Sequence, residues 1–292
     1  MVKWIQLLVT GITVGSIYSL IALGYVTIYR TSRIVNMAQG AFVMFGGLFA
    51  YSFLSQLGLP YWLAALLAVV CVVVLGMVMY LLVLRPLIKI SLVSIILATM
   101  AISILSENVA LLKWGGYGNG LPSFSGDKAL FIGKVAVFPQ SLWVIGIMVV
   151  VLIGLYALTS LTRIGKKMTA TSNDPEAATL SGVNTGRMIL LAFAISAAIG
   201  AMGGIAIAPI NATSYLSGGI YALSGFVAAI LGGWGSASGA VVGGLALGII
   251  ESLCTGFMPA GYQDAVAFAL LILVLYFRPN GLLGVTAGEG EA

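Results

Sequence analysis

The feature that most constrains this chain is a nearly unbroken series of long apolar runs. Nine runs of 16 to 26 residues lie between Trp4 and Phe277, and most are separated by short polar stretches. A helix needs about 20 mainly apolar residues to cross the hydrocarbon core of a bilayer. Only 7% of the residues are charged, whereas an ordinary soluble domain has about 25%. The sequence therefore excludes a soluble enzyme, a disordered chain and a nucleic-acid-binding protein.

These runs predict an all-α, polytopic integral membrane protein with about eight to ten transmembrane helices. We expect residues 1–292 to form a single transmembrane domain. The 38 glycines are about twice the usual share, which favours close helix packing and Gly-rich broken segments. Residues 215–255 are broken mainly at 232–239, so they form either two full spans or half-helices that meet inside the membrane. The apolar runs are residues 4–29, 34–57, 61–84, 92–112, 140–161, 188–210, 215–234, 237–255 and 262–277.

Basic residues are distributed unequally between the two sides of this predicted domain. Nine of the 13 Lys and Arg residues fall on one side, and cytoplasmic loops are enriched in such residues. This side is therefore predicted to be cytoplasmic, together with the C-terminus and the loop 162–187. The N-terminus and the loop 113–139 are predicted to lie outside. The nine residues are Arg30, Arg33, Arg85, Lys89, Arg163, Lys166, Lys167, Arg187 and Arg278, and the other four are Lys3, Lys113, Lys128 and Lys134.

The predicted cytoplasmic loop 162–187 contains a short helix signature. Asn173 or Asp174 is a suitable N-cap, and Pro175 suits the first helical position. Glu176 in the first turn favours the helix dipole, and Gly182 is placed to end the helix. We therefore predict a helix over residues 175–181. Because so short a helix is not stable alone in water, it packs either on a partner protein or on lipid and the chain's own loops.

Five motifs follow one another along nearly the whole chain, at residues 11–24, 36–41, 173–184, 231–244 and 268–284. The third begins Asn-Asp-Pro-Glu-Ala-Ala, and the last ends Arg-Pro-Asn-Gly-Leu-Leu-Gly. In this order they resemble the permeases of branched-chain amino acid ABC importers, the LivH/LivM class, and its H-type member in particular. Two positions depart from the family pattern, because Gln39 replaces the usual His and Ala41 replaces the usual Glu.

The resemblance implies a permease subunit of a bacterial cytoplasmic (inner) membrane importer that works by alternating access. Its implied partners are the lipid bilayer, a second permease that is homologous or identical, two cytoplasmic ATPase subunits and an extracytoplasmic solute-binding protein. The chain itself is not expected to be an enzyme or to hold a cofactor. Residues 165–167 lack the upstream Gly and the trailing Ser or Thr of a phosphate-binding loop, so ATP would bind to the partner subunits. The residues implied to couple to the ATPases are Asp174, Pro175, Glu176, Ala177, Ala178, Leu180 and Gly182.

The resemblance favours a branched-chain or other apolar amino acid as the solute. The family also includes carriers of urea, short amides and aromatic carboxylates, so these remain alternatives. An ion-coupled secondary transporter and a passive channel are rival classes, and the capped cytoplasmic helix argues against both. The chain has no His, so we expect no His metal site and assign no metal ligands.

Polar residues inside the apolar runs are candidates for the substrate pathway, because a charge at the bilayer centre costs about 2.5–3.5 kcal/mol on insertion scales. For Glu107 and Glu251 a structural role is an equal alternative. Asn36 and Gln39 either line an inner gate or satisfy backbone groups at a helix break. The pathway candidates are Asn36, Gln39, Glu107, Asn108 and Glu251, with Tyr18 and Asn211 as weaker ones.

Overall fold

The computed structural model describes residues 2–87, 91–126, 128–132, 135–257 and 262–283. The prediction of an all-α polytopic membrane protein is confirmed. In the described part of the chain, six helical stretches are long and apolar enough to cross a membrane, and shorter apolar helices cover 217–232 and 265–277. The six stretches are Val2–Ser32, Tyr61–Leu87, Leu92–Trp114, Pro139–Leu161, Thr185–Ile207 and Ala237–Thr255.

The secondary-structure elements follow the apolar runs, with additions in the two long loops. Three π-helical turns extend α2, α3 and α6, and cover Ser52–Gln56, Tyr80–Leu84 and Ala157–Leu161. The strands β1 and β2 form an antiparallel hairpin in the loop 113–139. The elements are α1 (Val2–Ser32), α2 (Gln39–Tyr51), α3 (Tyr61–Met79), α4 (Arg85–Leu87), α5 (Leu92–Trp114), β1 (Leu130–Ile132), β2 (Val135–Val137), α6 (Pro139–Tyr156), α7 (Arg163–Asn173), α8 (Pro175–Leu180), α9 (Thr185–Ile207), α10 (Ser217–Gly232), α11 (Ala237–Thr255) and α12 (Gln263–Phe277).

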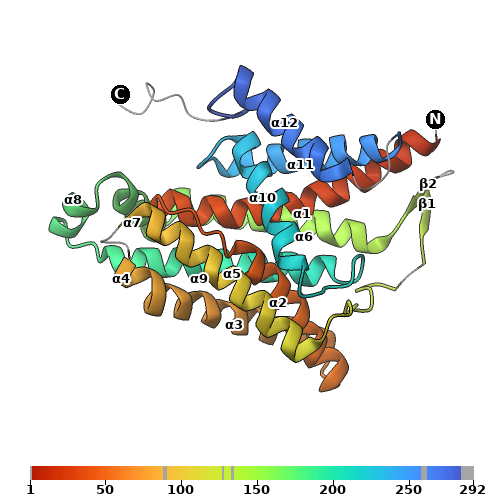
Figure 1. Ribbon diagram of the computed structural model, residues 1–292, viewed down its shortest axis with the longest axis horizontal. Helices are drawn as coiled ribbons and strands as arrows, with labels where there is room; N and C mark the ends of the chain where they lie inside the picture. Colours follow the sequence, from red (N-terminus) through yellow and green to blue (C-terminus); the bar gives the residue numbers. More distant parts are fainter. Residues whose placement is uncertain (1, 88–90, 127, 133–134, 258–261, 284–292) are drawn as a thin grey trace.

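The long helices run between two ends of the molecule that differ in charge. Figure 1 shows α4, α7 and α8 at one end, which we call the basic end because it carries Arg85, Arg163, Lys166 and Lys167. The N-terminus and the β1–β2 hairpin lie at the opposite end, which we call the hairpin end. This grouping matches the predicted sidedness. Lys89, Lys134 and residues 284–292 lie outside the described ranges, so the position of the C-terminus stays a prediction.

The centre of the fold is the contact between α1 and α11. Glycines on both helices allow their backbones to touch, as small residues do in membrane helix pairs. A Cβ atom added at Gly15 would lie 2.8 Å from the Gly244 carbonyl oxygen, and one at Gly11 would lie 2.8 Å from the Ile249 Cα. Residues of α1 from Gly11 to Ile28 supply much of the buried core. The helix is therefore held along most of its length, and side chains of α1 and α11 are brought together.

A break in the chain separates α1 from α2. Arg33 has a φ of 59°, and residues 34–38 are not helical although Ile34 and Asn36 are buried. The Ala38 N–H donates to Asn36 Oδ1 at 3.1 Å, and the Met37 N–H donates to Thr99 Oγ1 at 3.2 Å. These side-chain oxygens satisfy backbone groups that have no helical partner. The predicted span 34–57 is thus corrected to a helical segment that begins only at Gln39.

The second break lies between α10 and α11. Helix α10 has 16 residues, which corresponds to about 24 Å at the helical rise and is less than the ~30 Å hydrocarbon core. Gly233 and Gly235 in the connecting turn have φ values of 109° and 92°, which favour glycine. The structure therefore matches neither alternative for residues 215–255 in full, because α10 is short whereas α11 is long enough to span, and the two helices pack together.

Candidate functional site

A cavity of about 820 Å³ lies between helices at the hairpin end. Its volume falls in the range of about 300–1,000 Å³ that is typical of small-molecule sites. The walls come from α1, the start of α6, the end of α9, the start of α10 and the end of α11. Because these elements belong to separate parts of the sequence, packing alone assembles the cavity.

One wall of the cavity carries a buried carboxyl group. Glu251 of α11 is 5% exposed, and Tyr18 of α1 donates a hydrogen bond from Oη to Glu251 Oε2 at 2.8 Å. Among the described residues that line the cavity, Glu251 is the sole Asp, Glu, Lys or Arg. The charge of the cavity wall is therefore negative whenever Glu251 is ionised. The two helices that carry this pair are the ones joined by the glycine contacts of α1 and α11.

Neutral polar groups line the rest of the cavity. Asn211 donates from Nδ2 to Tyr221 Oη at 2.9 Å. The Gln140 Nε2 donates to the Ala206 carbonyl at 2.8 Å, and the Gln6 Nε2 donates to the Ala136 carbonyl at 2.8 Å. The two glutamines therefore tie α6 to α9 and α1 to β2 around the cavity.

Of the predicted pathway residues, Glu251 and the two weaker candidates Tyr18 and Asn211 line this cavity. Gln140 and Tyr221 are additional lining residues that the sequence reasoning missed. A Tyr in an apolar helix has the same sequence signature as a core residue. Gln140, the first residue of its apolar run, resembles an ordinary helix start. Nothing in the local sequence therefore marks Gln140 or Tyr221 as a cavity residue.

Asn36 and Gln39 lie away from the cavity, at the break before α2. Gln39 is fully buried, and the Ser196 hydroxyl, which has one hydrogen to donate, lies 2.7 Å from Gln39 Oε1 and 2.8 Å from the Gly24 carbonyl oxygen. These contacts match the alternative in which the two residues satisfy polar groups at a helix break. A role at an inner gate stays a prediction.

Glu107 and Asn108 also lie outside the cavity lining. They are on α5, where Asn108 Nδ2 donates to the Ile104 carbonyl of its own helix at 2.8 Å. Glu107 lies next to α10, because a Cβ added at Gly219 would be 3.2 Å from Glu107 Oε1. Their predicted pathway role therefore stays a prediction.

The second candidate region is α8 at the basic end. Asp174 caps it, because Asp174 Oδ1 accepts from the N–H groups of Glu176 and Ala177, both at 2.9 Å. Pro175 occupies the first helical position, and Gly182 after the helix has a φ of 80°. The predicted helix is confirmed with Asp174 as its cap, and it ends at Leu180, one residue earlier than predicted.

The exposure of α8 is one-sided. Ala178 is 4% exposed and faces the protein, whereas Leu180 is 90% exposed. Glu176 and Ala177 are exposed as well. Leu180, Glu176 and Ala177 therefore form the outward side of α8.

Helix α7 precedes α8 and was not predicted. Its cap is Thr162, whose Oγ1 accepts from the Gly165 N–H at 3.1 Å. Met168 and Thr171 are buried on its inner side. The stretch looked like a loop because Arg and Lys dominate its beginning and small or polar residues follow. The Thr162 cap and the spacing of Ile164 and Met168 could have identified it.

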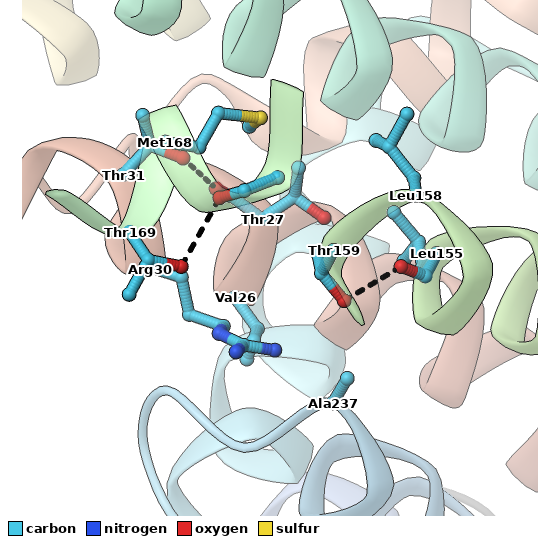
Figure 2. Close-up of a pocket in the computed structure, with 11 residues that line it drawn as sticks. Val26, Thr27, Arg30, Thr31, Leu155, Leu158, Thr159, Met168, Thr169 and Ala237 are labelled. Carbon is cyan, nitrogen blue, oxygen red and sulfur yellow. Dashed lines mark hydrogen bonds between the residues drawn. The ribbon is translucent and has the colours of Figure 1, made fainter. Parts of the chain in front are cut away.

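A small pocket marks the place where α7 contacts α1. Figure 2 shows Arg30 and Thr31 of α1 grouped with Met168 and Thr169 of α7. Thr159 of the π-helical turn after α6 closes it. Its volume of about 20 Å³ is enough for about one water molecule, so it does not suit a solute. At this pocket α7 packs against α1, the helix that also carries Tyr18.

The family described as "Branched-chain amino acid transport system / permease component" matches residues 7–275. The chain belongs to this family.

Relatives confirm this permease assignment over nearly full length. LivH, the high-affinity branched-chain amino acid transport system permease protein of Escherichia coli, is 30% identical, and the match covers 96% of each chain. BraD, the corresponding permease protein of Pseudomonas aeruginosa, is 32% identical with the same coverage. The probable branched-chain amino acid transport permease LivH of Methanocaldococcus jannaschii is 29% identical over 94% of this chain and 91% of its own. The resemblance inferred from the five motifs is therefore confirmed.

Proposed function

We propose that this permease is the membrane-spanning subunit of an ABC importer that moves branched-chain or related apolar amino acids by alternating access. The observation that carries the proposal is the position of two features on one rigid helix. Tyr18 in the middle of α1 lines the cavity at the hairpin end, and Arg30 near its end contacts α7 at the basic end. A force applied to α7 and α8 therefore has a direct path to the cavity wall.

The cavity suits a small solute with an apolar part. Val9, Val14, Ile17, Ile207 and Ile220 supply apolar lining beside the polar pairs described above. Such a wall can contact a branched aliphatic side chain, while the polar groups contact the charged end of an amino acid. Urea, short amides and aromatic carboxylates are the alternative solutes.

The basic end would face the cytoplasm, with the C-terminus on the same side, because Lys and Arg are enriched in cytoplasmic loops. Two ATPase subunits would bind there. We expect them to contact the exposed residues of α8, above all Leu180 and Glu176, with Asp174, Pro175 and Gly182 shaping the helix. ATP would bind and react in those subunits. The solute-binding protein would deliver the solute at the hairpin end.

A second permease and the lipid of the cytoplasmic (inner) membrane would cover the exposed apolar faces. Large side chains on α5, α6 and the turn after α3 are examples, with Leu112 87%, Val150 69% and Leu82 73% exposed. In water such an apolar surface would be unfavourable, by about 25 cal/mol per Å², whereas lipid or a homologous helix matches it.

A cross-linking experiment tests the coupling part of the proposal. Leu180→Cys in a background without Cys71 and Cys254 is labelled with benzophenone maleimide and illuminated in native membranes. We expect a covalent adduct with an ATP-hydrolysing subunit. Tyr117→Cys is the matched control, because Tyr117 is 89% exposed but lies in the loop predicted to be outside. Adducts at Tyr117 and none at Leu180 would contradict the assignment.

An uptake experiment tests the transport part. The complete complex, purified from its membrane, is reconstituted in proteoliposomes with the binding protein and radiolabelled leucine. Accumulation should require ATP and should persist when ionophores collapse ion gradients. Uptake that follows an ion gradient without ATP would support the secondary transporter instead, and equilibration without either would support a channel.

A further inference from the structure

The cavity has a chemical asymmetry that bears on which solutes it accepts. Its described lining contains one carboxyl group, Glu251, and no Lys or Arg. The neighbouring Tyr18 is a neutral donor at 2.8 Å, and its hydrogen bond orients the carboxyl group. An ionisable residue within a membrane segment is commonly retained for function. A cavity of this kind attracts a cationic group and repels an anionic one.

We propose that Glu251 is the recognition group for the solute's ammonium, so that the cavity accepts amine-bearing solutes and discriminates against neutral amides and amine-free carboxylates. This inference rests on the proposed transport function, because it places the solute in this cavity. It goes beyond that function by assigning the specificity to one side chain and by separating amino acids from the other solutes of the family. Urea and short amides offer no cation to Glu251, and an aromatic carboxylate brings a like charge.

A second polar pair in the cavity, Asn211 and Tyr221, supplies what an amino acid's carboxylate needs. Asn211 Nδ2 donates to Tyr221 Oη at 2.9 Å, so the phenol oxygen is the acceptor of that bond and its own hydrogen is directed elsewhere. Tyr221 is 8% exposed and lines the cavity. A phenol donor can bind a carboxylate oxygen without carrying a charge. The apolar residues Val14 and Ile17 then remain for the side chain of the solute.

The hydrogen bond of the pair and the charge of Glu251 can be removed separately by substitution. Tyr18→Phe removes the hydrogen bond but leaves the charge of Glu251. Glu251→Gln keeps the size and the hydrogen-bond acceptor but removes the charge. If the pair only holds α1 against α11, Tyr18→Phe should be the more impaired variant, because Glu251→Gln keeps the acceptor of the hydrogen bond. If the charge binds the solute, only Glu251→Gln should lose discrimination between amines and non-amines.

The probe is an engineered cysteine at the cavity. Ile210 lines the cavity and is 49% exposed, so Ile210→Cys in the background without Cys71 and Cys254 should react with N-ethylmaleimide. The complete transporter in lipid nanodiscs is treated with the reagent alone or with leucine, 3-methylbutylamine or 4-methylpentanoate. These three ligands share the branched chain and differ in the amine and the carboxylate.

Leucine and 3-methylbutylamine should each slow the alkylation at least fivefold, and 4-methylpentanoate should not slow it. Glu251→Gln should abolish the protection by both amines, while the rate without ligand stays as in the parent. Tyr18→Phe and Glu251→Asp should both retain the preference for amines. Equal protection by 4-methylpentanoate and leucine in the parent would overturn the inference, and so would unchanged protection in Glu251→Gln.

The outcome also separates this inference from the proposed function. If ATP-driven uptake occurs but Glu251→Gln takes up leucine as the parent does, the role of Glu251 is wrong and the importer stands. If no ATP-driven uptake of any solute occurs in the assembled complex, the importer proposal itself is wrong. Should Glu251→Gln fail to assemble, the comparison of the three ligands in the parent decides alone.

Discussion

Gly244→Ala is the substitution whose effect follows most directly from the contact of α1 and α11. A Cβ added at Gly244 would lie 2.5 Å from the Ser19 backbone nitrogen and 2.7 Å from its Cα. Favourable contacts of this kind are about 3.5 Å long, so the two helices must separate by ~1 Å. Backbone atoms are involved, so a rotamer change cannot relieve the overlap.

The expected magnitude has a structural and a functional part. Overpacking of this sort typically costs about 1–3 kcal/mol. The same separation would lengthen the bond from Tyr18 Oη to Glu251 Oε2 from 2.8 Å to ~3.8 Å, beyond the ~3.0 Å limit of an O–H···O hydrogen bond. We therefore expect a less stable protein that also transports more slowly.

The assay compares ATP-driven leucine uptake in proteoliposomes and thermal unfolding of the purified complex. Gly203→Ala is the matched control, because it lies in the neighbouring α9 and its added Cβ would meet the Leu20 Cβ at an ordinary 3.7 Å. Gly244→Ala should unfold at a lower temperature and show several-fold slower uptake, and Gly203→Ala should match the parent. Equal behaviour of the two variants would refute the reasoning.

Two predictions concern α8. Asp174→Ala removes the acceptor for two backbone N–H groups, which costs about 0.5–2 kcal/mol of helix stability. The yield of the Leu180 cross-link and the rate of ATP-driven uptake should both decrease. Asp174→Asn keeps an oxygen that can cap the helix, so both should stay near the parent values. Gly182→Val places a β-branched residue at a φ of 80° although nothing lies within 4 Å of its Cβ. Left-handed backbone costs an ordinary residue about 1–2 kcal/mol, so uptake should fall while membrane insertion stays normal. Normal uptake in Gly182→Val would remove the end of α8 from the coupling mechanism.

Local signals in the sequence predicted the elements whose causes are local. The apolar runs predicted membrane helices because about 20 apolar residues suffice to span a bilayer. Asp174, Pro175 and Gly182 predicted α8 because capping depends on residues within one turn. Helix α7 was missed because its buried side chains, such as Met168 and Thr171, are sparse among polar residues, and apolar periodicity is the signal on which helix prediction depends.

The sequence by itself determined the membrane class, the family and the capped helix at the basic end. Only the tertiary structure decided where the apolar run at 34–57 breaks, because that break depends on Thr99 of another helix accepting the Met37 N–H. It also decided which polar residues share a cavity. Tyr18 and Glu251 are 233 positions apart, and they meet because glycines on α1 and α11 let two backbones touch. Such a meeting depends on which helix faces pack together, and the order of residues along one helix does not contain that information.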